Sequence, residues 1–283
     1  YSFKGAVDKN GKLVAMQNHL IAMATDGSPT TGSNQYATEF PGLNIKNYRG
    51  TTTYQEVKTP CGPWRAPGSN VSGWAVQSFL AEMSHLAGRD HLDFLLDIMG
   101  EPRWFEPGNI RSLNTGRASD VIKLAAEKAG WGRKMPKGRG LGLSFYFSHA
   151  AHVAEVAEVS VDENKKIKVH KVTVAVDIGP VMNMSGAKSQ VEGAIVDGLS
   201  TMLDLEITME KGRIEQSNFH NYRPLRIAHT PIIDTHFIQS DYGPTGIGEP
   251  ALPPLAPAVA NAIFAATGER VRTMPISAEG YRV

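Results

Sequence analysis

The sequence contains one cysteine, Cys61, among its 283 residues. A single thiol cannot build a disulfide framework, and it cannot supply a cysteine-held zinc or iron–sulfur site within the chain. No apolar run approaches the ~20 residues that a membrane-spanning helix needs. Blocks of like charge are missing as well, and the net charge is only +1. These absences argue against a transmembrane segment, a nucleic-acid binder and a membrane-surface binder.

Familiar catalytic motifs are also missing. The sequence has no Walker loop, no Gly-x-Ser-x-Gly nucleophile elbow and no His-Glu-x-x-His metal motif. The stretch "GRGLGLSF" (138–145) has some glycines of a dinucleotide loop, but it precedes an expected strand rather than a helix N-terminus. His149 and His152 are three apart in an expected strand and should project to opposite faces, so we assign them core or surface roles. A metal-free hydrolase is disfavoured because no nucleophile–histidine pair is evident.

The composition is that of an ordinary globular protein. Apolar residues make up 41% of the chain, which suffices for one large domain or two modest ones. The chain begins at Tyr1 and enters strand-like sequence at once, without an initiator Met or a signal peptide. We expect a processed chain, a fragment or one piece of a split subunit, so the cellular location cannot be read from the sequence.

Strand-like and helical patterns are mixed without strict alternation. We expect a hairpin at Asn10-Gly11, loops with short strands over 25–60, a strand pair with a bulge around the turn at 162–166, and a hairpin over 206–218. Expected helices start at Ser72, at the Asp90 cap, near 118, at the Asn183 cap and at Pro257; they end near Gly88, Gly100, 129, Leu205 and Ala266. This mixture indicates an α+β (mixed α/β) fold. A soft boundary at "KGRG" divides residues 1–138 from 139–283.

One carboxylate stands out in the stretch "GPTGIGEPALPPLAPAVANAIFAATG" (243–268). Glu249 lies between Gly248 and Pro250, and no Lys or Arg occurs between Arg226 and Arg270. Glycine lets a backbone approach a ligand closely, and the prolines limit the entropy cost of positioning the side chain. Such a carboxylate suits a general base, whose pKa burial would raise and an adjacent cation would lower. The alternative is a surface glutamate in a Gly/Pro turn.

Three separated segments together resemble the molybdenum-binding subunit of the molybdenum hydroxylases, a family that includes xanthine dehydrogenase, aldehyde oxidoreductase and the isoquinoline 1-oxidoreductase β-subunit. They are "GPWRAPGSN" with the helix after it, "VAEVSVDENKKIKVHKVTVAVDIGPVMNMSGAKSQVEGAIVDGLS" (156–200), and the Glu249 stretch. The stretch "NFHNYRPLR" (218–226) favours the isoquinoline branch. The segments keep the family's order and cover about residues 55 to 283.

The resemblance implies hydroxylation of an aldehyde or an N-heterocyclic aromatic with oxygen derived from water. A pyranopterin, in its cytosine dinucleotide form, would hold the molybdenum through dithiolene sulfurs, so no side chain of this chain is expected as a metal ligand. Two electrons would leave through [2Fe–2S] clusters on a small partner subunit, and a cytochrome c is a candidate further partner. The resemblance favours the bacterial periplasm over the cytoplasm.

Within this resemblance Glu249 matches the general base. Positions matching cofactor-side segments are Arg65, Ala66, Gly68, Asp177, Gly179, Gln190, Gly248 and Asn261. Gln190 matches the glutamine that hydrogen-bonds the pterin, and Arg65 with the peptides of 66–68 borders the metal's oxo side. Structural alternatives stay open: an ion pair for Arg65, a plain turn residue for Asp177, and exposed helix positions for Gln190 and Asn261.

The sequence also departs from the family. Only Trp64 is aromatic in the segment where xanthine dehydrogenases carry stacking aromatics, so a purine substrate is disfavoured. The family's early glycine-rich segment and its Gly-Gln-Gly pterin motif are missing. A complete pocket would therefore need another polypeptide or an N-terminal part of the same subunit. The competing hypothesis is a non-catalytic assembly or binding module that keeps this fold and binds no molybdenum.

Overall fold

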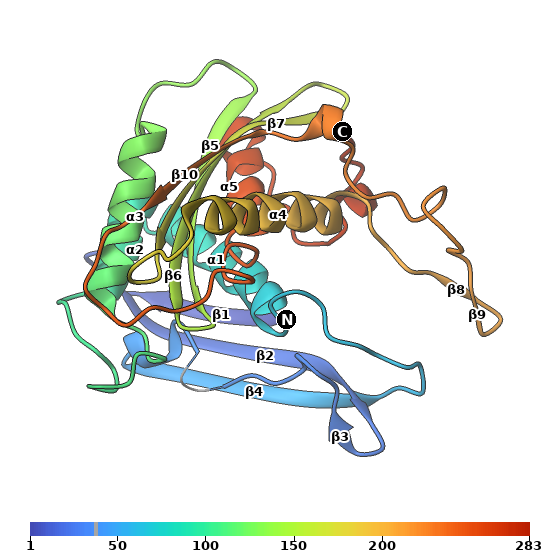
Figure 1. The fold of residues 1–283 in the computed structure, drawn as a ribbon, viewed down its shortest axis with the longest axis horizontal. Helices are drawn as coiled ribbons and strands as arrows, with labels where there is room; N and C mark the ends of the chain where they lie inside the picture. The colour runs from blue at the N-terminus through green and yellow to red at the C-terminus, as the bar shows by residue number, and fades with distance from the viewer. Residues whose placement is uncertain (37–38) are drawn as a thin grey trace.

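Two β-sheets organise the chain, which the computed structural model describes over residues 1–36 and 39–283. The first sheet contains β1 (Ser2–Val7), β2 (Leu13–Thr25), β3 (Ser28–Pro29) and β4 (Asn47–Glu56). The second has the order β10-β7-β6-β5, from β5 (Arg139–Ser148), β6 (Ala151–Val161), β7 (Ile167–Asp177) and β10 (Ile232–Phe237). A short hairpin of β8 (Met209–Glu210) and β9 (Arg213–Ile214) projects from the body (Figure 1).

The first sheet partly corrects the sequence-based expectation. The hairpin at Asn10-Gly11 is confirmed, with β1 antiparallel to β2 and the Asp8 carboxylate accepting the Asn10 N–H at 2.8 Å. The expectation of loops with only short strands over 25–60 is wrong for β4, which pairs in parallel with β2 along its whole length. Residues 37–38 of that stretch lie outside the described residues. β4 is exposed or half-buried throughout, so its sequence lacks the apolar alternation that marks a strand.

The second sheet confirms the strand pair around 162–166 and its bulge. β5, β6 and β7 run antiparallel, and Glu158 pairs with Lys171 whereas Val159 pairs with Val169, which leaves His170 as the extra residue. β10 adds a parallel edge strand beside β7. It lies in a span that the sequence indicates only as loop-rich, because a six-residue edge strand with mixed polarity carries little local signal.

The expected helices are all present. They are α1 (Ser69–Leu86), α2 (His91–Met99), α3 (Thr115–Ala129), α4 (Met184–Leu203) and α5 (Leu255–Thr267), with 3₁₀ turns η1 (Gly42–Asn44), η2 (Ile227–His229) and η3 (Ile276–Glu279). Asp90 and Asn183 cap α2 and α4 by accepting backbone N–H groups, as predicted. α1 begins at Ser69 rather than Ser72, and its N-cap is Gly68, which has a φ of 75°.

Helices cover both faces of the second sheet. α1, α2 and α3 share one apolar core with β5 and β6, and α4 and α5 share another with β6 and β7. The β5–α5 approach is very close at Gly142, where a Cβ would stand inside 3.0 Å of Ala258 O and Ala262 N. In Figure 1 α1 lies between the two sheets and α4 crosses in front of α5. The second sheet with its helices is therefore the platform on which the later loops rest.

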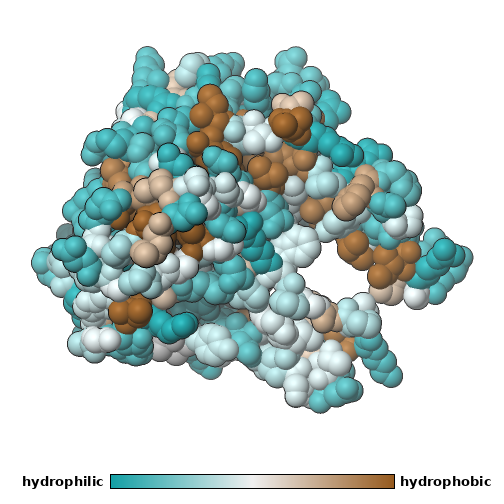
Figure 2. Space-filling view, in the orientation of Figure 1, coloured by the Kyte–Doolittle hydropathy of each residue, from teal (hydrophilic) through white to brown (hydrophobic). Residues whose placement is uncertain are grey.

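The surface in the view of Figure 2 is largely hydrophilic with separated apolar patches. A notch opens on the right of that view, between the part that carries α4 and the part that carries β4. Within residues 1–36 and 39–283, no helix is both long and apolar enough to cross a membrane. The division predicted at 138/139 falls in the segment that joins α3 to β5, and it stays a prediction.

Candidate active site

Glu249 directly follows a loop, residues 240–248, whose beginning is hydrogen-bonded to the second sheet. The Ser240 hydroxyl donates to Asp177 Oδ1 at 2.7 Å, and the Thr245 N–H donates to the carbonyl oxygen of Ile178 at 2.9 Å. Asp177 is the last residue of β7, and Ile178 follows it directly. After Glu249, a proline-rich turn leads directly into α5. The carboxylate is therefore carried by a loop fixed at both ends.

Two elements hold the two oxygens of the Glu249 carboxylate. The Ala66 N–H donates to Oε1 at 3.1 Å, and His149 Nε2 lies 3.1 Å from Oε2. Ala66 is fully buried just before α1, with a φ of 56°. The Glu249 side chain itself is 39% exposed. A carboxylate held on both oxygens and still open to solvent can accept a proton from a group that approaches from outside.

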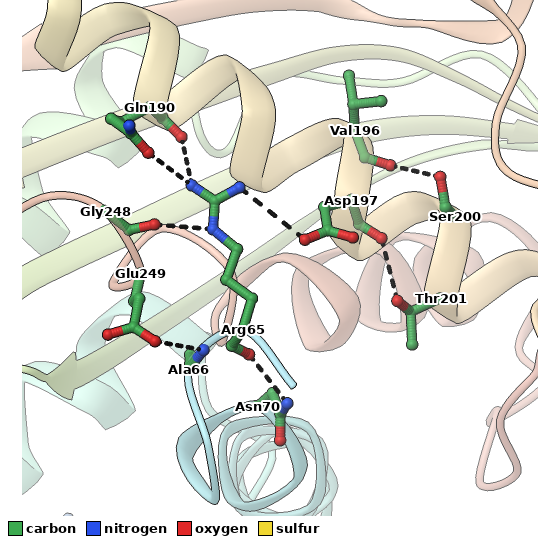
Figure 3. Close-up of polar contacts among 10 residues, drawn as sticks. All are labelled: Arg65, Ala66, Asn70, Gln190, Val196, Asp197, Ser200, Thr201, Gly248 and Glu249. Atoms are coloured by element: carbon green, nitrogen blue, oxygen red, sulfur yellow. Dashed lines mark hydrogen bonds and ion pairs between the residues drawn. The ribbon is translucent and has the colours of Figure 1, made fainter. Parts of the chain in front are cut away.

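Arg65 connects the three segments of the site (Figure 3). Its Nε donates to the carbonyl oxygen of Gly248 at 2.7 Å, and its Nη2 donates to the backbone oxygen and to Oε1 of Gln190 at 3.0 and 3.1 Å. Nη1 lies 3.9 Å from Asp197, where burial raises the pKa of the carboxyl group and the guanidinium partly offsets that effect. Long, half-exposed ion pairs contribute little, so the hydrogen bonds to carbonyl oxygens are the main contacts of Arg65.

Gln190 and Gly248 form an open edge beside this arginine. Gln190 is exposed on α4, and because Arg65 occupies its Oε1, its amide nitrogen is the group left to bind a ligand. A Cβ at Gly248 would meet nothing nearer than Gln190 Oε1 at 4.0 Å. The space in front of the backbone is therefore free for a flat group to approach. The structure thus brings together Glu249, Gly248, Gln190, Arg65 and Ala66.

Asp177 and Gly179 lie beneath the loop rather than in this cluster. Arg117 of α3 donates two hydrogen bonds of 2.8 Å to the Asp177 carboxylate, and the two side chains are 1% and 2% exposed. Burial raises the pKa of Asp177, but hydrogen bonds from Arg117, Gly179 and Ser240 more than offset it and leave the pKa lowered. Asp177 is therefore the acceptor of a buried ion pair, a partner that the turn sequence alone did not indicate.

Gly179 and the remaining predicted positions have clear structural environments. Gly179 has a φ of 72°, and a Cβ there would stand within 2.8 Å of the carbonyl oxygens of Tyr242 and Gly243, so the Glu249 loop packs directly on it. Gly68 is the N-cap of α1 and lies next to Gly32. Asn261 is buried between α5 and β5, donating to Leu143 O at 3.1 Å, and lies outside the Glu249 cluster. Its cofactor contact stays a prediction.

His149 is the site residue that sequence reasoning missed. It lies in the tight turn between β5 and β6, where His149 and Ala150 have φ values of 51° and 63°. His152 is buried in β6, its Nε2 accepting the Asn114 N–H at 3.1 Å, and burial lowers its pKa to about 3. Two-residue turns with two positive φ values usually carry Asn-Gly, so the His149-Ala150 pair gives no sequence signal for this turn. The contact with Glu249 could not be predicted locally either, because the two residues are 100 positions apart.

Protein ligands for a metal are not gathered at this site. Over the two described ranges, no group of three or more His, Cys, Asp or Glu side chains is arranged to hold a metal ion. The groups that the cluster presents are a carboxylate, a carboxamide nitrogen and backbone close to an open surface. These groups suit hydrogen bonding to a heterocyclic cofactor that carries its own metal ligands.

Comparisons with known proteins identify the family of this chain. The family model of the molybdopterin cofactor-binding domain matches residues 109–231. The chain is 34% identical over 75% of its length to the membrane-bound aldehyde dehydrogenase [pyrroloquinoline-quinone] of Gluconacetobacter polyoxogenes, and 35% identical over 58% to the isoquinoline 1-oxidoreductase subunit beta of Brevundimonas diminuta. The chain belongs to the molybdopterin-binding subunits of the molybdenum hydroxylases.

Solved structures show the same fold. Quinoline 2-oxidoreductase from Pseudomonas putida 86 matches 97% of this chain with a TM-score of 0.78 at 12% identity. Aldehyde oxidoreductase from Desulfovibrio gigas matches 99% with a TM-score of 0.70 at 15% identity. The mixed α+β fold expected from the sequence is confirmed.

The chain spans only part of each relative. It covers 28% of the aldehyde dehydrogenase, 22% of the isoquinoline oxidoreductase subunit, 60% of the quinoline oxidoreductase chain and 48% of the aldehyde oxidoreductase chain.

Proposed function

We propose that this chain supplies the general base and one wall of the cofactor site of an enzyme that hydroxylates an aldehyde or an N-heterocyclic aromatic. One observation carries the proposal: the Glu249 carboxylate is held on both oxygens and stands at an open edge formed by Gln190 and Gly248. The names of the relatives, aldehyde dehydrogenase and isoquinoline 1-oxidoreductase, support the two substrate classes.

The residues of the cluster have separate tasks. The molybdenum pyranopterin, in the cytosine dinucleotide form, supplies the two-electron oxidation when it is bound. Gln190 would hold the pterin through its amide nitrogen, and the peptides near Ala66 would border the reacting centre. Glu249 then accepts the proton of the water-derived oxygen that adds to the substrate carbon, using a lone pair that Ala66 and His149 leave free. Arg65 keeps Gln190 and Gly248 at a constant separation.

Further protein is needed to complete the pocket. A general base works best where water is excluded, whereas the Glu249 side chain is 39% exposed. The chain also spans about a quarter of the length of its curated relatives. Both observations support a remaining part of the molybdenum subunit as the cover, and a small [2Fe–2S] subunit as the electron acceptor, with a cytochrome c as a further candidate.

The test is turnover of Glu249→Gln in the assembled enzyme purified from its native host. The amide keeps the shape but cannot accept the proton, so we expect kcat to fall by about 10²–10⁴-fold with normal molybdenum and pterin contents by elemental and fluorescence analysis. Glu192→Gln, at an exposed position on α4, is the matched control and should behave as wild type.

Two outcomes would contradict the proposal. Turnover of Glu249→Gln within twofold of wild type would remove the assigned role of the base. A wild-type assembly without molybdenum or pterin would contradict it as well and would favour the non-catalytic binding module. If such an assembly contained pyrroloquinoline-quinone instead, its cofactor would be the one printed in the name of the Gluconacetobacter relative.

A further inference from the structure

The imidazole of His149 lies 3.1 Å from the Glu249 carboxylate, on the oxygen that Ala66 does not contact. We propose that His149 is a positioning residue that holds Glu249 in the orientation needed for proton acceptance. This inference rests on the proposed function, because it deepens the role of the same carboxylate.

The geometry of the carboxylate requires a second contact. The terminal torsion of a glutamate has a broad, nearly two-fold energy profile, so one hydrogen bond leaves the carboxylate plane free to rotate. The Ala66 N–H donates to Oε1 at 3.1 Å, and His149 Nε2, on a different element, lies 3.1 Å from Oε2. The two contacts together fix the plane, and the remaining lone pairs of both oxygens then point in constant directions.

The support beneath His149 is rigid and shared with Glu249. The turn that carries His149 enters β6 at Ala151, and His152 pairs with Asp177 across the β6–β7 ladder. Asp177 is also the acceptor that ties Ser240, at the start of the Glu249 loop. Asp177 therefore supports both the strand that follows the His149 turn and the loop that carries Glu249, so the second sheet sets the distance between the imidazole and the carboxylate.

The backbone conformation of the β5–β6 turn orients the His149 side chain. Both of its central residues have positive φ, a conformation that is strained for Ala150 and is more common at functional sites than elsewhere. Glycine adopts this conformation freely, so His149→Gly removes the imidazole without disturbing the turn. Ala150→Gly is the matched control, since it makes the same backbone change one residue away and leaves the imidazole in place.

The experiment measures steady-state kinetics of the assembled enzyme, and a structure of each variant. For His149→Gly we expect kcat to fall about tenfold with KM changed less than twofold, partial recovery with added imidazole, and unchanged molybdenum content. The structure should show the Glu249 carboxylate in more than one orientation. His149→Gln, whose amide can still donate to Oε2, should retain more activity than His149→Gly, and Ala150→Gly should match wild type.

The inference is overturned if His149→Gly has the wild-type kcat, or if Glu249 keeps one unchanged orientation in that variant. Should His149→Gly fail to assemble, His149→Gln decides: an unchanged kcat with the contact to Oε2 lost also overturns it. These results are distinct from failure of the proposed function, which is read from the turnover of Glu249→Gln and from the molybdenum and pterin contents of the wild-type assembly.

Discussion

The buried pair of Arg117 and Asp177 makes a strong prediction about stability. The Asp177→Asn substitution keeps the shape of the side chain and one carbonyl oxygen, but it leaves the Arg117 guanidinium, which is 1% exposed, without a counter-charge. Breaking a buried ion pair on one side costs about 3–5 kcal/mol. The guanidinium still stacks on Tyr242 at 4.4 Å, so we expect the lower end, ~3 kcal/mol, in the free energy of unfolding.

The assay is urea unfolding followed by circular dichroism, with a thermal scan beside it. A loss of ~3 kcal/mol corresponds to a fall in Tm of roughly 5 °C for a chain of this size. The control is Asp120→Asn, an exposed position on the same helix as Arg117, which should stay within about 0.5 kcal/mol of wild type. The double variant Arg117→Met with Asp177→Asn removes both charges and should recover part of the loss.

The pH dependence of this effect has a definite sign. The folded-state pKa of Asp177 is lowered, so the unfolded chain binds the proton first on acidification. The stabilisation is complete above the unfolded pKa of about 3.9 and is lost as the pH falls through the folded pKa. The gap between wild type and Asp177→Asn should therefore narrow below about pH 4. A stability for Asp177→Asn equal to that of Asp120→Asn at pH 7 would refute the reasoning.

Two further predictions concern the second sheet. Gly142→Ala should destabilise the fold by about 3 kcal/mol, because the new Cβ would collide with backbone atoms of α5. The control is Gly62→Ala, which should be neutral because a Cβ at Gly62 would meet open space. Equal urea midpoints for the two variants would contradict this prediction. Glu155 is fully buried, both of its oxygens lack a hydrogen-bond partner among the described residues, and burial raises its pKa well above the ordinary value. As the pH rises, the unfolded chain therefore releases the Glu155 proton before the folded chain does, and wild type loses stability. The free energy of unfolding of Glu155→Met should rise relative to that of wild type above pH ~4.5, by up to about 1.4 kcal/mol per pH unit. A pH-independent difference between the two would contradict this prediction.

Local signals in the sequence determined much of the secondary structure. Asp90 and Asn183 mark the starts of α2 and α4 because a capping side chain bonds to N–H groups two or three residues away. The hairpin at Asn10-Gly11 depends on a similarly short range. Glu249 was also visible from the sequence, since its isolation between Gly248 and Pro250 is a local property, although its role is a proposal.

Only the tertiary structure decided which groups meet. β4 is joined to β2 by backbone hydrogen bonds, and its side chains are exposed or half-buried. The β4 sequence therefore lacks the alternation of apolar and polar residues from which a strand is predicted. Arg117 reaches Asp177 across 60 residues of sequence, and His149 reaches Glu249 across 100, each brought there by the order of strands in the second sheet. A sequence shows which chemical groups are available, but the partner that holds a charge depends on long-range packing, which no local pattern of residues encodes.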